Sequence, residues 1–476
     1  MNEEQKAFVL KTENLTKEDV ERAVHVTAHA KRAVDIFFQI PGSREEYQKD
    51  KEGFIKKWKI DLLPDDIDFL MFPKDAKEKS RILQENDLDS MPESFFRYRQ
   101  YMLNKMYARD RMIDTYCVPS NARLKKWRER QMRRCDGALG GVNKAFIHAM
   151  VTIELAEGCS VGCEFCGLGA GRLKEIFRYT EENAELFKGV LRKLHEIIGD
   201  GAGYGMMYFA TEPLDNPDYE FFQDAYQKEF SFIPQITTAA CDRDLERTKK
   251  LVHQIMNGGG LIHRFTIRSE EMARKVFDFF EPEELALVEL LPQYPEAPGF
   301  VPYVKAGKLC EDEERKNESN DPGTIVCVDG FRVNFPRRTI TVITPCHADS
   351  KYPKGISESE PVTFEDAEDF GQKLNDIIEK YMIVELPGDE VLTIYDYFSV
   401  KNVDGKTALC SNYGEWYRIS SEYIVHVIDM LKENKYDKHA IVRETSDMYQ
   451  TPPENVYWIL NDLWKKGIIK DKKFFE

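Results

Sequence analysis

Residues 157–167 read EGCSVGCEFCG and carry three cysteines in a short, glycine-rich stretch. Three residues separate Cys159 from Cys163, and two separate Cys163 from Cys166. Thiolates at these spacings can wrap a tight loop around a cubane iron–sulfur cluster, with each sulfur on a different iron. The fourth iron then has no protein ligand and can bind a small molecule. The stretch therefore predicts a [4Fe–4S] cluster held by a loop.

A structural zinc site is the main alternative for these cysteines. Such a site needs four ligands, usually as two pairs a dozen or more residues apart. The next cysteine, Cys241, lies 75 residues after Cys166 and has no other cysteine near it in the sequence. Buried thiols that pack as small hydrophobic groups are a second alternative, but the polar, glycine-rich surroundings fit it poorly.

The composition is that of a folded chain with more than one domain, since 42% of its 476 residues are hydrophobic. Its 83 acidic residues outnumber the 67 basic ones, and the net charge of -16 argues against a general nucleic-acid binder. The sequence starts MNEEQK without an apolar signal core, and it has no apolar stretch of the roughly 18 residues that a membrane helix needs. We therefore expect a cytoplasmic protein without nucleic-acid or membrane partners, whose cysteines are reduced or bind metal.

Four regions follow one another along the chain. Residues 1–145 predict a helical N-terminal domain, because apolar residues recur there at three- and four-residue spacing. In residues 146–305 short apolar runs alternate with amphipathic helices, which is typical of βα units around a parallel sheet and predicts an α/β fold. Residues 306–385 predict a bridging region with a β-hairpin, whose turn is Asn334–Arg338. Residues 386–476 predict a small α+β C-terminal domain.

Individual elements can be assigned within these regions. The expected strands of the βα region are residues 149–156, 206–211, 235–239, 262–267 and 285–291, and its best-marked helix is 181–198. In the C-terminal domain, residues 391–400 and 406–410 predict strands, and three helices follow. A capping box at Thr451–Glu454 marks the last helix, and Gly467 is its expected C-cap. The basic run Arg123–Arg134 is interpreted as a solvated helix face, with a docking site for an acidic peptide as the alternative.

The C-x3-C-x-aromatic-C pattern of the cysteines resembles the signature of the radical S-adenosylmethionine (SAM) superfamily, with Phe165 in the aromatic position. The resemblance implies a partial (β/α)6 TIM barrel, a cluster loop after its first strand, and SAM on the open iron of the [4Fe–4S] cluster. It further implies SAM contacts near the ends of later strands: the amino group at Glu212, the ribose at Thr237 or Thr238, and the carboxylate at Arg264, Arg268 or Ser269. Both glycines of the family's Gly-Gly-Glu motif are replaced, so only Glu212 carries over. For each of these residues, a polar strand-end residue or a solvated arginine is the alternative interpretation.

Four segments resemble the PoyD-type peptide epimerases that mature proteusins: residues 154–163, 211–219, 327–334 and 344–346. This narrower resemblance implies an isomerase that converts L- to D-amino acids in a ribosomally synthesised precursor peptide. A 5′-deoxyadenosyl radical would abstract a Cα hydrogen, and a cysteine thiol would return a hydrogen atom to the opposite face. The resemblance implies a donor cysteine downstream of the barrel, for which Cys346 is the first choice and Cys327 the second.

The seven cysteines outside the motif stand singly, and this bears on the reaction class. Epimerisation is redox-neutral for the peptide and needs no second cluster, whereas enzymes that crosslink peptides oxidatively usually carry auxiliary clusters with further grouped cysteines. A maturase that forms thioether or carbon–carbon crosslinks is the alternative within the same cofactor class. A zinc-stabilised binding protein without catalytic activity is the alternative from another class. The cysteines interpreted as structural thiols are Cys117, Cys135, Cys241, Cys310 and Cys410.

The pattern of residues 386–476 resembles a winged-helix or PqqD-like recognition element. That resemblance implies that the domain binds the leader of the precursor peptide by adding a strand to an exposed sheet edge. DNA binding is the usual alternative for a winged helix, and Glu454 and Asp462 on its last helix disfavour it. Radical chemistry of this kind also implies an external electron donor, such as flavodoxin or ferredoxin.

Overall fold

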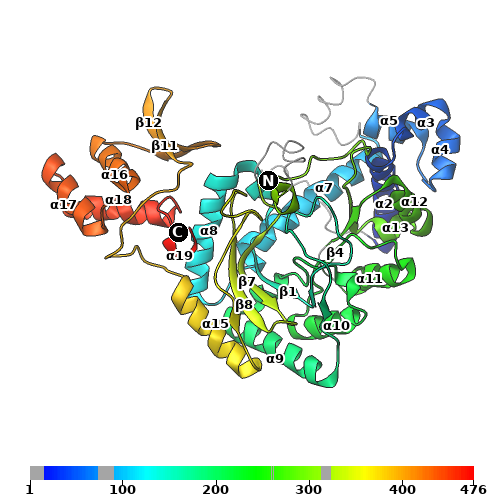
Figure 1. Cartoon of the computed structure of the whole chain (residues 1–476). Coiled ribbons are helices and arrows are strands. Elements are labelled where there is room, and N and C mark those ends of the chain that lie inside the picture. Colours follow the sequence, from blue (N-terminus) through cyan, green and yellow to red (C-terminus); the bar gives the residue numbers. More distant parts are fainter. Residues whose placement is uncertain (1–15, 73–90, 259, 261, 312–322, 476) are drawn as a thin grey trace. The chain divides into compact units, whose positions relative to one another are not determined.

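The computed structural model describes residues 16–72, 91–258, 260, 262–311 and 323–475 of the chain. Helices and short strands are mixed along it, so the fold is α/β as expected (Figure 1). The chain forms two compact units. The first contains residues 1–116, 158–161 and 206–303, and the second contains residues 117–157, 162–205 and 304–476. Cys159 thus belongs to the first unit, whereas Cys163 and Cys166 belong to the second.

Helices form the described N-terminal part of the first unit. They are α2 (Lys17–Gln39), α3 (Ser43–Lys49), α4 (Lys51–Lys57), α5 (Pro64–Met71), α7 (Glu93–Arg111) and the π-helix η2 (Met112–Tyr116). A capping box at Thr16 starts α2. One face of α2 is buried, and its Phe37 shares a hydrophobic core with Phe265 and Val288 of the sheet in this unit.

That sheet is small and parallel, in the order β4 (Thr237–Thr238), β5 (His263–Ile267) and β6 (Val288–Pro292). The helical elements of the same region are η5 (Pro213–Asp215), α10 (Tyr219–Phe230), α11 (Leu245–Gly258), α12 (Glu270–Phe279) and α13 (Pro282–Leu285). The strands predicted at 262–267 and 285–291 are confirmed within a few residues, and the one predicted at 235–239 is reduced to β4. Parallel strands with helices between them are the arrangement that βα units produce.

The strand predicted at residues 206–211 is wrong. Met206 makes a single bridge to Gln235, and no regular strand follows it. The chain turns instead into η5, which Glu212 caps with its side chain and Pro213 begins, because proline has no N–H to lose at that position. Met206 and Phe209 are nevertheless buried, so the apolar run indicates burial in the core rather than strand pairing.

The second unit contains a five-stranded sheet. Its path is β1 (Ala149–Glu154), β7 (Val328–Asn334), β8 (Thr339–Pro345) and β10 (Val362–Thr363), and β9 (Ile356–Glu358) also pairs with β8. The hairpin predicted from the sequence is confirmed as β7 and β8. Strands β1 and β7 are parallel, with Ala149 opposite Val328 and Glu154 opposite Asn334. The turn of the hairpin therefore lies where β1 ends, and its open end lies where β1 begins.

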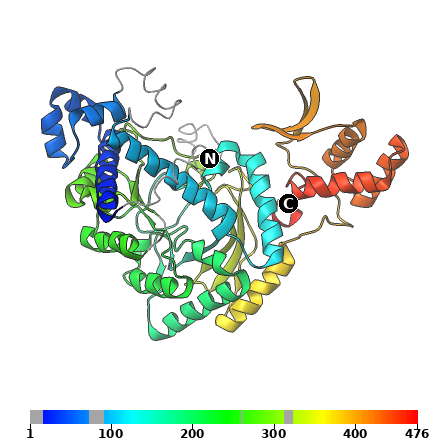
Figure 2. The same ribbon diagram turned by 180° about the vertical axis from the view of Figure 1, so that it is seen from behind.

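Outside this sheet, the elements of the second unit between residues 117 and 381 are mostly helical. They are α8 (Ala122–Leu139), η3 (Gly140–Ala145), the short strands β2 (Ala156–Glu157) and β3 (Glu175–Ile176), α9 (Glu181–Ile198), η4 (Asp200–Tyr204), α14 (Lys308–Glu311) and α15 (Ala367–Tyr381). The helix predicted at 181–198 is confirmed as α9. It lies beside α15 in both views (Figures 1 and 2). Gly189 permits this close approach, because a Cβ added there would lie 2.5 Å from the Cβ of Ala367.

The C-terminal part of the second unit combines a small sheet with three helices. Its elements are β11 (Ser399–Val403), β12 (Lys406–Ser411), β13 (Gly414–Arg418), α16 (Glu422–Glu433), α17 (Lys438–Tyr449), α18 (Pro453–Lys465) and the short α19 (Lys472–Phe475). The strand predicted at 391–400 is wrong for most of its length, because Val391 and Ile394 make only isolated bridges. The capping box predicted for α18 is also absent, since its N-cap is Pro452. Gly467, with φ +68°, follows the helix as expected.

The basic run on α8 is a solvated face only in part, because Lys125, Lys126 and Arg133 are exposed but three other arginines are not. Arg128, Arg130 and Arg134 are all less than 5% exposed. The Arg130 guanidinium forms a buried ion pair with Asp471 and lies 3.7 Å from the ring centroid of Trp464. The interpretation fails for Arg130 because its counter-ion and the ring that covers it come from the far end of the chain, and it fails for Arg128 because that guanidinium donates to the Ile147 and His148 carbonyls. Among the described helices, none has the length and apolar character needed to cross a membrane.

Candidate cluster-binding site

The cysteine loop, residues 158–174, is closed at its base by a short strand pair. β2 pairs antiparallel with β3, so the two ends of the loop are adjacent. The Glu157 carboxylate binds the Lys174 Nζ at 3.1 Å and also binds the Arg337 guanidinium. Hydrogen bonds from Arg337 and Lys174 lower the pKa of Glu157 to about 2. The base of the loop is therefore tied to the hairpin turn by charged groups at neutral pH.

The cysteines of the motif are more exposed than most others in the chain. Cys159, Cys163 and Cys166 are half-buried, as is Phe165, whereas Cys117, Cys135, Cys241, Cys346 and Cys410 are buried. Gly158, Gly162 and Gly169 adopt left-handed backbone conformations, with φ of 82°, 71° and 59°. Accessible thiols on a tightly turning loop suit thiolate ligation. The donor set therefore fits the three protein-bound irons of a [4Fe–4S] cluster.

Residues 306–308 pack against the second half of the cysteine loop. The backbone N–H of Lys308 donates to the Cys166 carbonyl at 3.0 Å, and its Nζ donates to the Cys163 carbonyl at 2.9 Å. Gly307 has φ +57°, and a Cβ added there would lie 2.5 Å from the carbonyl carbon of Gly167. Only glycine allows the two backbones to approach so closely.

In the first unit, Ser160 is anchored beside Cys159. Asp215 accepts hydrogen bonds from the Ser160 N–H, at 2.8 Å, and from the Ser160 hydroxyl. Arg243 donates from Nη1 to the Ser160 Oγ at 2.7 Å and to Asp215 Oδ1 at 3.0 Å. The Asp215 side chain is only 2% exposed. Because a buried carboxylate needs donors of this kind, the contact fixes the start of the motif within its unit.

Three residues expected to bind SAM come together at the end of β4. Glu212 is 3% exposed and accepts hydrogen bonds from the Thr238 hydroxyl at 2.6 Å and the Ala239 N–H at 2.9 Å. Arg268, which follows β5, donates from Nε to the Ala239 carbonyl at 2.8 Å. Burial raises the pKa of Glu212. A buried carboxylate and an exposed guanidinium on one backbone segment can bind an ammonium group and a carboxylate respectively.

Arg264 and Ser269 make contacts of a structural kind. Arg264 pairs through Nε with Glu289 of β6 at 2.8 Å. It precedes Arg268 by four residues, which is roughly 13 Å of extended chain. Ser269 is the N-cap of α12 and accepts a hydrogen bond from the Met272 N–H at 3.2 Å. The structure thus places Arg264 opposite Thr237 in the pairing of β4 with β5, with its side chain on Glu289, whereas Arg268 binds the backbone segment that also binds Glu212.

The two candidate donor cysteines flank the open end of the β7–β8 hairpin. Cys346 directly follows β8, is 6% exposed, and donates its N–H to the Gly355 carbonyl at 2.9 Å. Burial raises the pKa of the Cys346 thiol to about 12. Cys327 directly precedes β7, is half-buried, and accepts the Ala149 N–H at 2.9 Å through its carbonyl.

The cysteine loop reaches the same open end. A Cβ added to Gly167 would lie 3.1 Å from the Ile325 side chain, and one added to Gly169 would lie 3.8 Å from Lys354 Cε. Ile325 is two residues before Cys327, and Lys354 directly precedes the residue that accepts the Cys346 N–H. The loop thus starts beside the turn of the hairpin and returns to the hairpin's open end, where Cys327 and Cys346 lie.

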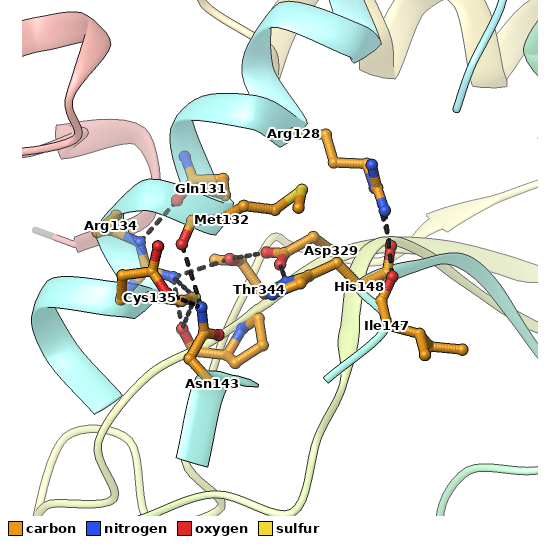
Figure 3. A network of polar contacts seen from close by, with 12 residues as sticks. Arg128, Gln131, Met132, Arg134, Cys135, Asn143, Ile147, His148, Asp329 and Thr344 are labelled. Carbon is orange, nitrogen blue, oxygen red and sulfur yellow. Dashed lines mark hydrogen bonds and ion pairs between the residues drawn. The ribbon is translucent and has the colours of Figure 1, made fainter. Parts of the chain in front are cut away.

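A buried polar network fixes the strand that leads to Cys346 (Figure 3). His148 and Thr344 both bind the Asp329 carboxylate, and Arg134 donates to the Thr344 hydroxyl at 2.9 Å. The ligand atoms of Cys135, His148 and Asp329 lie within 4.8 Å of one another, as a metal site would require. The Arg134 guanidinium, 3.1 Å from the Cys135 sulfur, opposes a cation there. We therefore interpret the network as structural.

A second group of potential ligands, His25, His29 and Glu283, lies in the first unit. His29 Nδ1 accepts a hydrogen bond from the Asp61 N–H at 2.9 Å, so the ring proton is on Nε2 in the neutral histidine. Burial lowers the pKa of His29 and keeps it neutral. Nε2, which faces Glu283 at 3.4 Å, is then a donor and has no lone pair for a metal.

The sequence did not single out Asp215, Gly307 or Lys308 as site residues. Asp215 lies inside segment 211–219, which resembles the epimerases, but the sequence indicates no role for its carboxylate. Gly307 and Lys308 have no motif around them, and only the folded structure brings them to the cysteine loop.

No family model matches the chain. A curated protein of Sinorhizobium fredii (strain NBRC 101917 / NGR234), named uncharacterized protein y4wI, is 34% identical over 291 residues. The match covers 60% of this chain and 57% of that protein, so the chain spans little more than half the length of this relative. A crystal structure of BtrN in complex with AdoMet and 2-DOIA is similar to 49% of this chain and is covered to 82%, with 16% sequence identity and a TM-score of 0.33.

Proposed function

We propose that the chain is a radical SAM enzyme whose [4Fe–4S] cluster is held by Cys159, Cys163 and Cys166. The observation that carries the proposal is the motif itself: three half-buried cysteines at the signature spacing, on a glycine-rich loop that follows β1 and the short β2. When bound, the cluster and SAM supply a 5′-deoxyadenosyl radical, a chemistry that belongs to the cofactor rather than to the protein. The protein's task is to bind, orient and shield the reactants.

The residues at the end of β4 are our candidates for holding SAM. The Glu212 carboxylate would accept a hydrogen bond from the methionyl ammonium group, and the Arg268 guanidinium would bind the carboxylate. Thr238 keeps Glu212 in place through the 2.6 Å hydrogen bond and is the candidate for a ribose contact. Phe165 would lie against the adenine, as the resemblance implies.

We propose further that the reaction is epimerisation of residues in a ribosomally synthesised precursor peptide. The Cα–H bond breaks and its hydrogen atom goes to the 5′-deoxyadenosyl radical. The Cys346 S–H bond then breaks and its hydrogen atom forms the new Cα–H bond on the opposite face. The sulfur left behind regains its hydrogen from one electron and one proton, and the electron comes from an external donor such as flavodoxin or ferredoxin.

The state of the Cys346 thiol supports this role. A hydrogen-atom donor must carry its proton, and the raised pKa of about 12 keeps Cys346 in the S–H form at neutral pH. The approach of Gly169 to Lys354 joins the cysteine loop to the segment that binds the Cys346 backbone. Cys327 at the other side of the hairpin's open end is the second candidate.

The C-terminal sheet and helices are our candidate for binding the leader of the precursor peptide. β13 pairs with β12 on one side and is the outer strand of its sheet, so its other edge can accept an added strand. Beside it lies a groove of about 430 Å³, lined by Trp416, Arg418 and Trp458 among others. Trp458 is 62% exposed, which is unusual for a tryptophan and typical of a binding surface.

The test is an incubation of the reconstituted enzyme with SAM, a reductant and candidate precursor peptides in heavy water. Epimerisation through an exchangeable thiol adds one solvent deuterium per modified residue and changes the mass in no other way. Loss of two hydrogens per event would instead indicate a crosslinking maturase. A chain that takes up zinc but no iron and sulfide, and does not cleave SAM, would refute the enzyme assignment.

The donor role has its own variant and control. Cys346→Ala should still cleave SAM but give no D-residues. Cys117→Ala is the matched control, since Cys117 is also a buried thiol but lies outside both the β7–β8 hairpin and the C-terminal sheet. Normal D-residue formation by Cys346→Ala would move the donor role to Cys327 or another group.

A further inference from the structure

Lys308 lies outside the cysteine motif but contacts two of its cysteines at once. Its N–H donates to the Cys166 carbonyl, and its Nζ donates to the Cys163 carbonyl at 2.9 Å. The residue before it, Gly307, touches the backbone of Cys166 and Gly167 so closely that no side chain fits. The contact is therefore a fitted one between two backbones rather than a chance approach of a surface lysine.

Among the side chains that the structure describes, Lys308 has no ion-pair partner. Within the described part of the chain, no carboxylate lies within 4.0 Å of its Nζ, and its hydrogen-bond partner there is a carbonyl oxygen. Lys174, by contrast, pairs with Glu157 at the base of the same loop. Within the described part of the chain, the cysteine loop thus contacts an ammonium group that is not engaged in an ion pair.

A cluster bound by three thiolates becomes more negative when it accepts an electron. Its reduction potential responds to nearby charge and to hydrogen bonds around the ligands. A cation fixed on the backbone of two ligating cysteines stabilises the reduced form more than the oxidised form. A neutral side chain of the same length would lack this effect.

We propose that Lys308 is a positioning residue of the cluster site: it holds the Cys163–Cys166 segment and, through its ammonium group, makes reduction of the cluster more favourable. The proposal rests on the proposed function, because it needs the cluster that the cysteines are expected to bind. It concerns how readily the cluster receives its electron, which is the step that the external donor must drive.

The experiment compares the anaerobically reconstituted wild type with Lys308→Met, Lys308→Arg and Lys174→Gln, with the reduced cluster followed by electron paramagnetic resonance during a redox titration. Lys174→Gln is the control, since it removes one positive charge from the same loop without touching a cysteine carbonyl. We expect Lys308→Met to make reduction roughly tenfold less favourable, which is about 59 mV for a one-electron couple. Lys308→Arg and Lys174→Gln should stay within twofold of the wild type. A Lys308→Met protein with full iron content and the wild-type potential would overturn the proposal.

A second measurement judges the positioning role without the cluster. In the iron-free proteins, the rate at which iodoacetamide alkylates Cys163 and Cys166 is read by mass spectrometry of the peptides. Each rate is divided by the thiolate fraction taken from its pH profile, so that the lost ammonium charge does not enter. Lys308→Met should then raise the rate at least threefold, and Lys174→Gln should leave it unchanged. Equal rates in wild type and Lys308→Met would overturn the positioning role. If the wild type takes up no iron at all, the proposed function fails, and the alkylation rates still decide on Lys308.

Discussion

Replacing Gly307 with alanine should loosen the second half of the cysteine loop. The added Cβ would meet the Cys166 carbonyl oxygen and lie 2.5 Å from the Gly167 carbonyl carbon, and side-chain carbons do not approach other atoms within 3.0 Å. The left-handed φ of +57° alone costs a non-glycine residue about 1 kcal/mol. Relief of the clash would break the hydrogen bond from the Lys308 N–H, worth about 1 kcal/mol, and the charged one from its Nζ, worth about 2 kcal/mol. We therefore expect local opening of the loop to become easier by about 4 kcal/mol.

Gly162→Ala provides the matched control. Gly162 lies in the same loop with φ +71°, and a Cβ added there would have nothing within 4 Å, so this variant measures the backbone cost alone. The assay is hydrogen exchange of the Gly169 amide, which donates to the Cys166 carbonyl at 3.0 Å. Exchange in Gly307→Ala should be about 100-fold faster than in Gly162→Ala, since the difference of about 3 kcal/mol corresponds to two factors of ten. Equal exchange in the two variants, with circular dichroism showing both folded, would refute the reasoning.

Three further variants test contacts described above by urea unfolding. Asp215→Asn should lower the free energy of unfolding by about 1–3 kcal/mol, because the buried anchor of Ser160 loses its charge; an unchanged value would mean that Ser160 is held by other groups. Burial by itself would raise the pKa of Glu289, but its ion pairs with Arg264 and Lys105 lower the pKa to about 2. The ionised carboxylate therefore stabilises the fold fully above about pH 4.5, and this stabilisation is lost as the pH falls toward 2. Glu289→Gln should therefore be about 3 kcal/mol less stable than the wild type at pH 7 and about half as much at pH 3, and a gap independent of pH would contradict the ion-pair explanation. Asp471→Asn should cost about 3–5 kcal/mol, because it leaves a buried arginine without its partner, and a cost below 1 kcal/mol would mean that water reaches that arginine.

Local patterns predicted the elements whose partners are close in the sequence. The hairpin follows from two β-rich runs around a short turn, and α9 follows from the periodicity of its apolar residues. The parallel pairing of β1 with β7 could not be predicted in this way, since nearly 180 residues separate Glu154 from its partner Asn334 and register across such a distance is decided by packing. The apolar run from Met206 was predicted as a strand, but its pairing is limited to the single bridge with Gln235, and its apolar residues are buried without further strand pairing.

For the candidate site, too, the parts that could be predicted are those whose residues lie close together in the sequence. The three cysteines lie within one loop, so their spacing alone indicates a cluster. The groups that hold the loop come from elsewhere: Asp215 is 55 residues from Ser160, and Lys308 is 145 residues from Cys163. Their residue types are ordinary, and only the fold gives them a role. The six-unit barrel, SAM binding and the donor cysteine stay predictions that follow from the resemblance.

The buried Arg130–Asp471 pair has a consequence for anyone who would exchange the C-terminal segment of this chain for another. A splice near residue 386 follows from the sequence, because the predicted C-terminal domain begins there. The incoming module would need an acid at the position of Asp471 and an aromatic ring at that of Trp464, or it would leave Arg130 buried without a counter-ion. Chimeras should therefore take α8 and the C-terminal segment from the same parent, so that Arg130 keeps both Asp471 and Trp464.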